Sequence, residues 1–171
     1  MLTKQVFVAA SLVSAVSAQA QPSTVPGATC TGTGPEVGIT IQGLKDRRGL
    51  IIVELYPAND KDFLADDVKL LAAHKPFRRV ERAVPGTGEV TTCIRAASPG
   101  RFALVVLHDR NADRRFALTV DGAGLGGNPR LRLARPRASE ATISVPPTGI
   151  ETTIRLNYWR GLGMRPVEGS R

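Results

Sequence analysis

The sequence predicts an all-β protein that folds as a single antiparallel β-sandwich, immunoglobulin-like or transthyretin-like. Short segments of alternating apolar and polar residues recur along the chain, and turn residues separate them at regular spacing. An unbroken apolar run from Phe102 to Leu107 is typical of a strand that is covered on both faces. The one helix-like pattern, at 61–73, predicts a short helix or a long loop that crosses between the sheets.

The chain is expected to begin with a signal peptide at 1–20, because this segment has the composition of a secretory leader. Lys4 is its only charged residue, an apolar run covers 6–16, and Ala-Gln-Ala at 18–20 fits a cleavage site. Cys30 does not follow a lipid-attachment sequence, and no later segment approaches the roughly 18 apolar residues of a membrane span. The sequence therefore predicts a secreted or periplasmic protein that is not an integral membrane protein.

Two cysteines, Cys30 and Cys93, remain in the exported chain, where an oxidising compartment favours a disulfide between them. Neither has a C-x-x-C neighbour or a nearby histidine, which disfavours the alternative of metal-binding or catalytic thiols. The segment 21–36 is rich in proline, glycine, serine and threonine, which predicts a flexible N-terminal arm. The disulfide would attach this arm to the strand that contains Cys93.

The strands are assigned from their periodicity. Residues 37–42 alternate and end at a glycine, and 50–56 is β-branched and apolar, so these two strands are expected to pair as a hairpin. Alternation in the last strand directs Ile154, Leu156 and Tyr158 inward. The other strands are expected at 77–84, 89–94, 102–107, 140–145 and 150–158. The chain thus has four expected parts: a signal peptide (1–20), a flexible arm (21–36), a sandwich domain (37–159) and a disordered tail (160–171).

The central strand leads into a polar, glycine-containing loop, 108–129, which is the predicted recognition site. Asp109, Asn111 and Asp113 place three oxygen-bearing side chains at alternate positions, as many calcium loops do. Arg114 stands where a calcium loop of the EF-hand type needs glycine, so a purely structural turn is the alternative. The candidate binding residues are His108, Asp109, Asn111, Asp121 and Asn128.

The sequence assigns no catalytic residue. His74 and His108 are the only histidines, which excludes a histidine-rich zinc site, and no serine lies in a G-x-S-x-G elbow. His108 and Asp109 are adjacent in an extended strand and therefore point to opposite faces. The prediction is an exported, non-enzymatic binding or structural module without a cofactor. The alternative is a calcium-dependent binding module or enzyme that uses the Asp109–Asn111–Asp113 loop.

The chain is strongly basic, with a formal net charge of +8, and this charge predicts affinity for polyanions. No set of base-stacking aromatic residues accompanies the arginines, so nucleic acid is not the expected partner. The partner stays unassigned: a solvated strand face accounts for these arginines, and an anionic glycan or lipid surface is the functional alternative. The arginines at 130, 132, 135 and 137 have the spacing expected of residues on a solvated strand face or strand edge.

Three motifs in and after the central strand carry a family resemblance. They are H-D-x-N-x-D (His108–Asp113), D-G-x-G (Asp121–Gly124) and G-N-P-x-L (Gly127–Leu131). With G-L-x-x-x-x-G at 43–49 and L-N-Y at 156–158, the sequence resembles the uncharacterised secreted family known as domain-of-unknown-function family 2141, from about residue 37 to residue 159. The resemblance implies a small β-sandwich with a signal peptide and no assigned reaction. Ala117 stands where this family usually shows an acidic residue.

Overall fold

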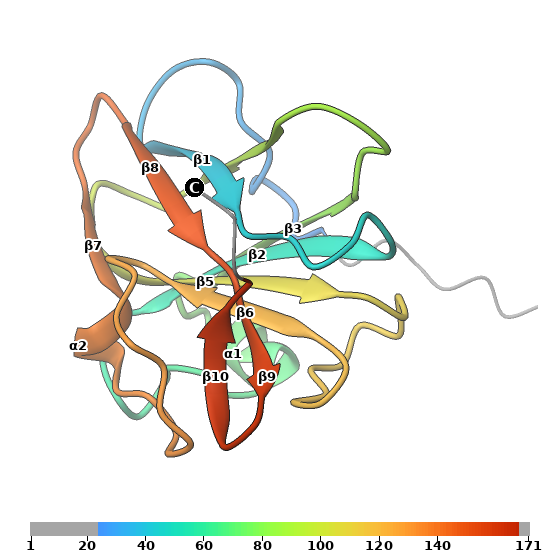
Figure 1. Ribbon diagram of the computed structural model, residues 1–171. Coiled ribbons are helices and arrows are strands. Elements are labelled where there is room, and N and C mark those ends of the chain that lie inside the picture. Colours follow the sequence, from blue (N-terminus) through green and yellow to red (C-terminus); the bar gives the residue numbers. More distant parts are fainter. Residues whose placement is uncertain (1–23, 168–171) are drawn as a thin grey trace, which may run out of the picture.

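The protein is a two-layered β-sandwich, as a computed structural model that describes residues 24–167 shows (Figure 1). The smaller sheet has the strand order β4 (Val90–Arg95), β1 (Glu36–Gln42), β8 (Ile150–Arg155). The larger sheet has the order β10 (Gly163–Pro166), β9 (Asn157–Arg160), β6 (Gly122–Leu125), β5 (Gly100–Asp109), β2 (Leu50–Pro57), β3 (Arg78–Ala83), and β7 (Thr142–Val145) pairs with β5. The predicted all-β sandwich is confirmed.

The core lies between the facing surfaces of the two sheets. Along β1, buried and half-buried residues alternate, which is the pattern of a strand with one face on the core. β2 and β5 are instead buried along nearly their full length, because the core covers one face and other segments cover the opposite face. The prediction that the central apolar run is covered on both sides is therefore confirmed.

The expected hairpin of the first two strands is wrong. β1 pairs antiparallel with β4 and parallel with β8, whereas β2 lies in the other sheet between β3 and β5. The connection 43–49 carries the chain from one layer to the other and ends at Gly49, which has a φ of 73°. A Cβ atom there would lie 1.9 Å from the carbonyl oxygen of Asp109, so only glycine lets the two backbones approach this closely. Among the described strands, β1 and β8 form the one parallel pair of this sandwich.

The single strand expected at 150–158 is two strands. The chain changes sheet at Leu156, so that β8 belongs to the smaller sheet and β9 to the larger one. The inward side chains were predicted correctly, since Ile154, Leu156 and Tyr158 are all buried. The helical elements are short: α1 (Asp67–Ala72) lies within the predicted 61–73 segment, and α2 (Ala138–Ala141) precedes β7.

The predicted disulfide is confirmed. Cys30 and Cys93 are bonded, with their Cα atoms 6.0 Å apart and 63 positions apart in the sequence. The described part of the expected arm packs on the sandwich instead of hanging free, because Val25 and Ala28 are buried. Its backbone also bonds to both sheets: Val25 N–H donates to the Arg79 carbonyl and Arg95 N–H donates to the Ala28 carbonyl.

The expected tail differs as well. Gly163–Pro166 forms β10, which pairs with β9 and buries Met164, so order extends into the segment that was predicted to be disordered. The predicted signal peptide, 1–20, lies outside the described residues. Within residues 24–167, no helix is long and apolar enough to cross a membrane.

Candidate functional site

The carboxylates of the predicted recognition loop bind the backbone of that same loop. Asp109, at the end of β5, is buried and accepts hydrogen bonds from the N–H groups of Asp113 (3.3 Å) and Arg114 (2.7 Å). Asp121, just before β6, is buried and accepts from Arg110 N–H (3.0 Å) and Ala117 N–H (2.7 Å). Each aspartate therefore closes a turn, which is the structural role that Asp commonly has.

The other predicted binding residues do not converge with these two. Asn111 is exposed and donates through Nδ2 to the Asp113 carboxylate at 2.7 Å. Asn128 lies beside β8, where its Oδ1 accepts from Arg155 N–H and its Nδ2 donates to the Thr153 carbonyl, each at 2.7 Å. The predicted residues thus hold the loop together at several separate points.

Calcium is expected to leave the protein's melting temperature unchanged. The oxygen atoms of Asp109 already accept amide hydrogens, and a cation would have to replace those bonds beside the cationic side chain of Arg114. The measurement is the thermal melt of chelator-treated protein with and without millimolar calcium. A stabilisation that an Asp113→Asn variant abolishes would restore the calcium-dependent alternative.

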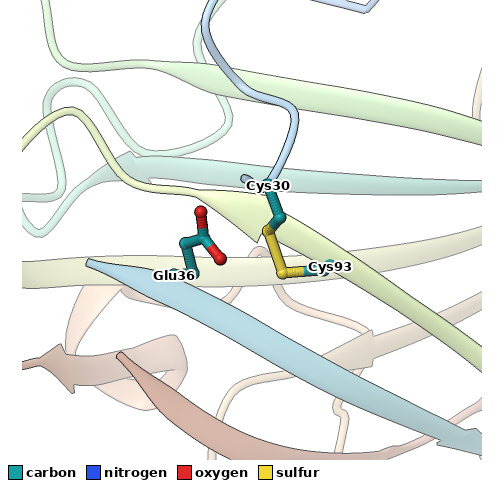
Figure 2. Close-up of side chains that lie close together, drawn as sticks. All are labelled: Cys30, Glu36 and Cys93. Carbon is teal, nitrogen blue, oxygen red and sulfur yellow. A yellow bond between two sulfur atoms is a disulfide. The ribbon is translucent and has the colours of Figure 1, made fainter. Parts of the chain in front are cut away.

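Outside the loop, one group of potential metal ligands is close-packed among the described residues: Cys30, Glu36 and Cys93 (Figure 2). The two sulfur atoms bond each other, so neither offers a thiolate to a metal. The Glu36 carboxylate accepts from the N–H of Thr31 at 2.7 Å and pairs with Arg95 at 2.8 Å. This group anchors the N-terminal segment beside the disulfide.

His108 is fully buried and engaged at both ring nitrogens. Nε2 lies 2.8 Å from the Arg48 carbonyl, which can only accept, so Nε2 carries the proton and Nδ1 accepts from the Tyr158 hydroxyl at 2.6 Å. The Tyr158 oxygen in turn accepts from Lys45 N–H at 3.1 Å. Burial lowers the pKa of His108 and raises the pKa of Tyr158 to about 12, so both groups are neutral at physiological pH.

Acidification is expected to destabilise the fold through His108. Because the folded-state pKa is below the ordinary value of 6.5, the unfolded chain binds the proton first, and stability falls as pH drops below about 6.5. Protonated Nδ1 would also need an acceptor where the Tyr158 hydroxyl now donates. The measurement is the free energy of unfolding between about pH 7.5 and about pH 5.5. His108→Gln should flatten this dependence, whereas His74→Gln, at an exposed position, should retain it.

A basic cleft opens at the edge of the larger sheet, where the loop after β6 meets the β9–β10 hairpin. Its volume is about 950 Å³. Among the described residues, its lining contains no carboxylate and no aromatic side chain. We call it the arginine cleft, after its four charged lining residues: Arg130, Arg155, Arg160 and Arg165.

A buried ionic cluster lies over β2 and β3 on the outer face of the larger sheet. Arg79 is 9% exposed, and its guanidinium lies 3.1 Å from Asp67 of α1, 3.1 Å from Glu81 and 3.5 Å from Glu54. Burial raises the pKa of Glu54. Arg114, from the predicted recognition loop, donates to Glu81 at 2.9 Å and so attaches that loop to this face.

The family described as "Uncharacterized protein conserved in bacteria (DUF2141)" matches residues 39–154. The chain belongs to this family. The match begins within β1 and ends within β8, so the resemblance found in the sequence is confirmed. No curated protein and no solved structure matches the chain significantly.

The arginine cleft of this DUF2141 protein spans the C-terminal limit of the family match. Arg130 lies inside the matched residues, and Arg155, Arg160 and Arg165 follow them. The match therefore includes one of the four cleft arginines, and the other three lie beyond it.

The sequence singled out Arg130 but not the other three cleft arginines. Its expectation of an arginine-bearing strand edge at 130–137 is wrong, since no strand forms there. Arg132 is exposed outside the cleft lining, and Arg135 donates to the Phe63 carbonyl. One signal could have drawn attention to Arg155, because the alternation of 150–158 directs this side chain outward.

Proposed function

We propose that this DUF2141 protein is an exported, non-enzymatic binding module that holds anionic groups of the cell envelope in the arginine cleft. The observation that carries the proposal is four arginines around one cleft with no carboxylate among the described lining residues. Guanidinium groups bind phosphate, sulfate and carboxylate in a bidentate manner, so the cleft suits repeated anionic groups.

The charge of the cleft supports an external anion. Among residues 24–167, no side-chain hydrogen bond or ion pair engages the guanidinium groups of Arg130, Arg155 and Arg165. Like charges that gather in one concavity repel each other, and a bound anion removes this repulsion. The lack of aromatic lining among the described residues favours a glycan or lipid headgroup over single-stranded nucleic acid, which binds on stacking platforms.

Two further observations support a binding role in an exported protein. His108 and Tyr158 are sealed in the core and bonded to each other, so neither can reach a substrate. The Cys30–Cys93 disulfide fits an oxidising compartment, in keeping with the leader-like sequence at 1–20.

The test is retention on a sulfated polyanion resin as a function of salt. Replacing Arg130, Arg155 and Arg165 together by serine should lower the affinity for the resin at least roughly tenfold, because each replacement removes charge-assisted hydrogen bonds to the sulfate groups. The matched control replaces three exposed arginines outside the cleft and removes the same net charge: Arg101, Arg115 and Arg132. Equal losses in the two triple variants would show that overall charge, and not the cleft, holds the polyanion.

A further inference from the structure

We infer that the anionic surface is a phospholipid membrane, and that the tip of the β9–β10 hairpin inserts Leu162 among the lipids while the cleft arginines hold the headgroup phosphates. This inference rests on the proposed function and names its partner. It adds an orientation, because it places the β10 edge of the larger sheet against the membrane.

The hairpin presents its leucine on a rigid support. Arg160 pairs with Gly163, so Gly161 and Leu162 are the two central residues of a tight turn. Gly161 has a φ of 62°, a conformation that glycine adopts readily at this position of a hairpin turn. Leu162 is 88% exposed, the largest value among the exposed large apolar residues of 24–167, and the tip projects at the lower end of the molecule (Figure 1).

Leu162 directly follows Gly161, which lines the arginine cleft. Arg160 precedes the turn, Arg165 follows it on β10, and both line the cleft together with Arg130 and Arg155. An apolar tip next to a cluster of cations is typical of interfacial membrane anchors, in which the apolar group enters the acyl boundary and the cations meet anionic headgroups. A soluble glycan would bind the arginines but would gain nothing from an exposed leucine at the rim.

Exposed apolar side chains also occur singly on protein surfaces without function. Val68 provides such a case here: it is 70% exposed on α1, and its neighbour Asp67 is acidic. The larger sheet carries β10 at one edge and β3, whose Arg79 contacts α1, at the other. Val68 therefore serves as the matched control for Leu162.

The chain carries its own reporter for insertion. Trp159 is the single tryptophan of the sequence and lies on β9, three positions before Leu162. Its side chain is half-buried, and tryptophan is enriched where proteins meet the membrane interface. Insertion of the hairpin tip should shift the Trp159 emission to shorter wavelength and expose it to quenching by brominated lipids.

The experiment measures flotation of the purified, disulfide-bonded protein with vesicles, together with Trp159 emission. Vesicles that contain phosphatidylglycerol should bind the protein and shift the emission, and vesicles of phosphatidylcholine alone should do neither. Leu162→Ser should weaken vesicle binding about tenfold. Replacing Arg130 and Arg165 by serine should weaken it roughly 30-fold. Val68→Ser should leave it unchanged.

Retention on the sulfated polyanion resin separates this inference from the proposed function. Leu162→Ser should elute from the resin as the unchanged protein does, although its vesicle binding is weaker. Retention on the resin without flotation would overturn the membrane inference and leave the proposed function standing. Failure in both assays would overturn both. Insertion would be overturned if the protein floated with vesicles but its Trp159 emission did not shift, and if Leu162→Ser bound vesicles as strongly as the unchanged protein.

Discussion

Replacing Cys30 and Cys93 together by serine is expected to lower the free energy of unfolding by about 4 kcal/mol. The bond joins residues 63 positions apart, and so it removes much of the conformational freedom of the unfolded chain. It also fixes the described N-terminal segment, in which Val25 and Ala28 are buried, against the sandwich. Loss of the bond should therefore both destabilise the domain and loosen this segment.

Urea unfolding measures the first effect and limited proteolysis the second. The double serine variant should unfold at lower urea concentration, and protease should cut first near residues 24–35. The unchanged protein under reducing conditions is the control and should behave as the variant does. An unaltered urea midpoint would contradict the assigned contribution of the disulfide.

Replacing Arg79 by methionine is expected to cost about 3–5 kcal/mol of stability. Methionine keeps most of the volume but removes the cation that faces Glu54, Asp67 and Glu81. Buried carboxylates without a counter-charge are costly, and this cost exceeds that of a typical surface ion pair several-fold. Arg78→Met is the matched control, because Arg78 is half-buried and donates only to the Phe77 carbonyl; it should cost about 1 kcal/mol.

The pH dependence of the Arg79 variant provides a second measurement. The folded-state pKa of Glu54 is raised by burial, and loss of Arg79 removes a charge that opposes this shift. Because the folded-state pKa of Glu54 is raised, its contribution to stability is fully present at pH below the ordinary value of 4.5. This contribution is lost as pH rises through the folded-state pKa. The deficit of Arg79→Met should therefore shrink in acid, and adding Glu54→Gln should reduce it at neutral pH. A deficit that is constant with pH would contradict the assigned role of Glu54.

Periodicity made the sandwich predictable. The alternation in 37–42 and the unbroken run at 102–107 determine which faces are buried, and burial is what a strand pattern encodes most directly. The disulfide was predictable because the sequence contains two cysteines, which leave a single pairing. The inward residues of 150–158 followed from the same alternation, even though the strand divides at Leu156.

The pairing partners of the strands were harder to predict from the sequence, because alternation identifies a strand's faces but not its neighbours. The connection 43–49 has turn composition, which fits a hairpin as well as a crossing between sheets, and so β1 and β2 were placed together. The arginine cleft was unpredictable for the same reason, since residues 128–130 and 155–167 come together only in the folded chain.

One feature of the sequence indicates the ionic cluster. Glu54 stands in the apolar segment Leu50–Tyr56, and a carboxylate inside a buried strand requires a partner. The alternation of arginine and apolar residues at 77–84 predicts a third strand but does not by itself identify which residue each arginine faces. Glu54 and Arg79 are directly paired across β2 and β3.

The position of β1 has a consequence for the newly made chain. Its two neighbours in the smaller sheet, β4 and β8, come from residues 90–95 and 150–155, so one side of β1 stays unpaired until residues 150–155 have emerged from the ribosome. An open strand edge is a template for association with other chains. Nascent or truncated products that end before residue 150 should therefore aggregate, and holdase chaperones that shield this edge should suppress that association.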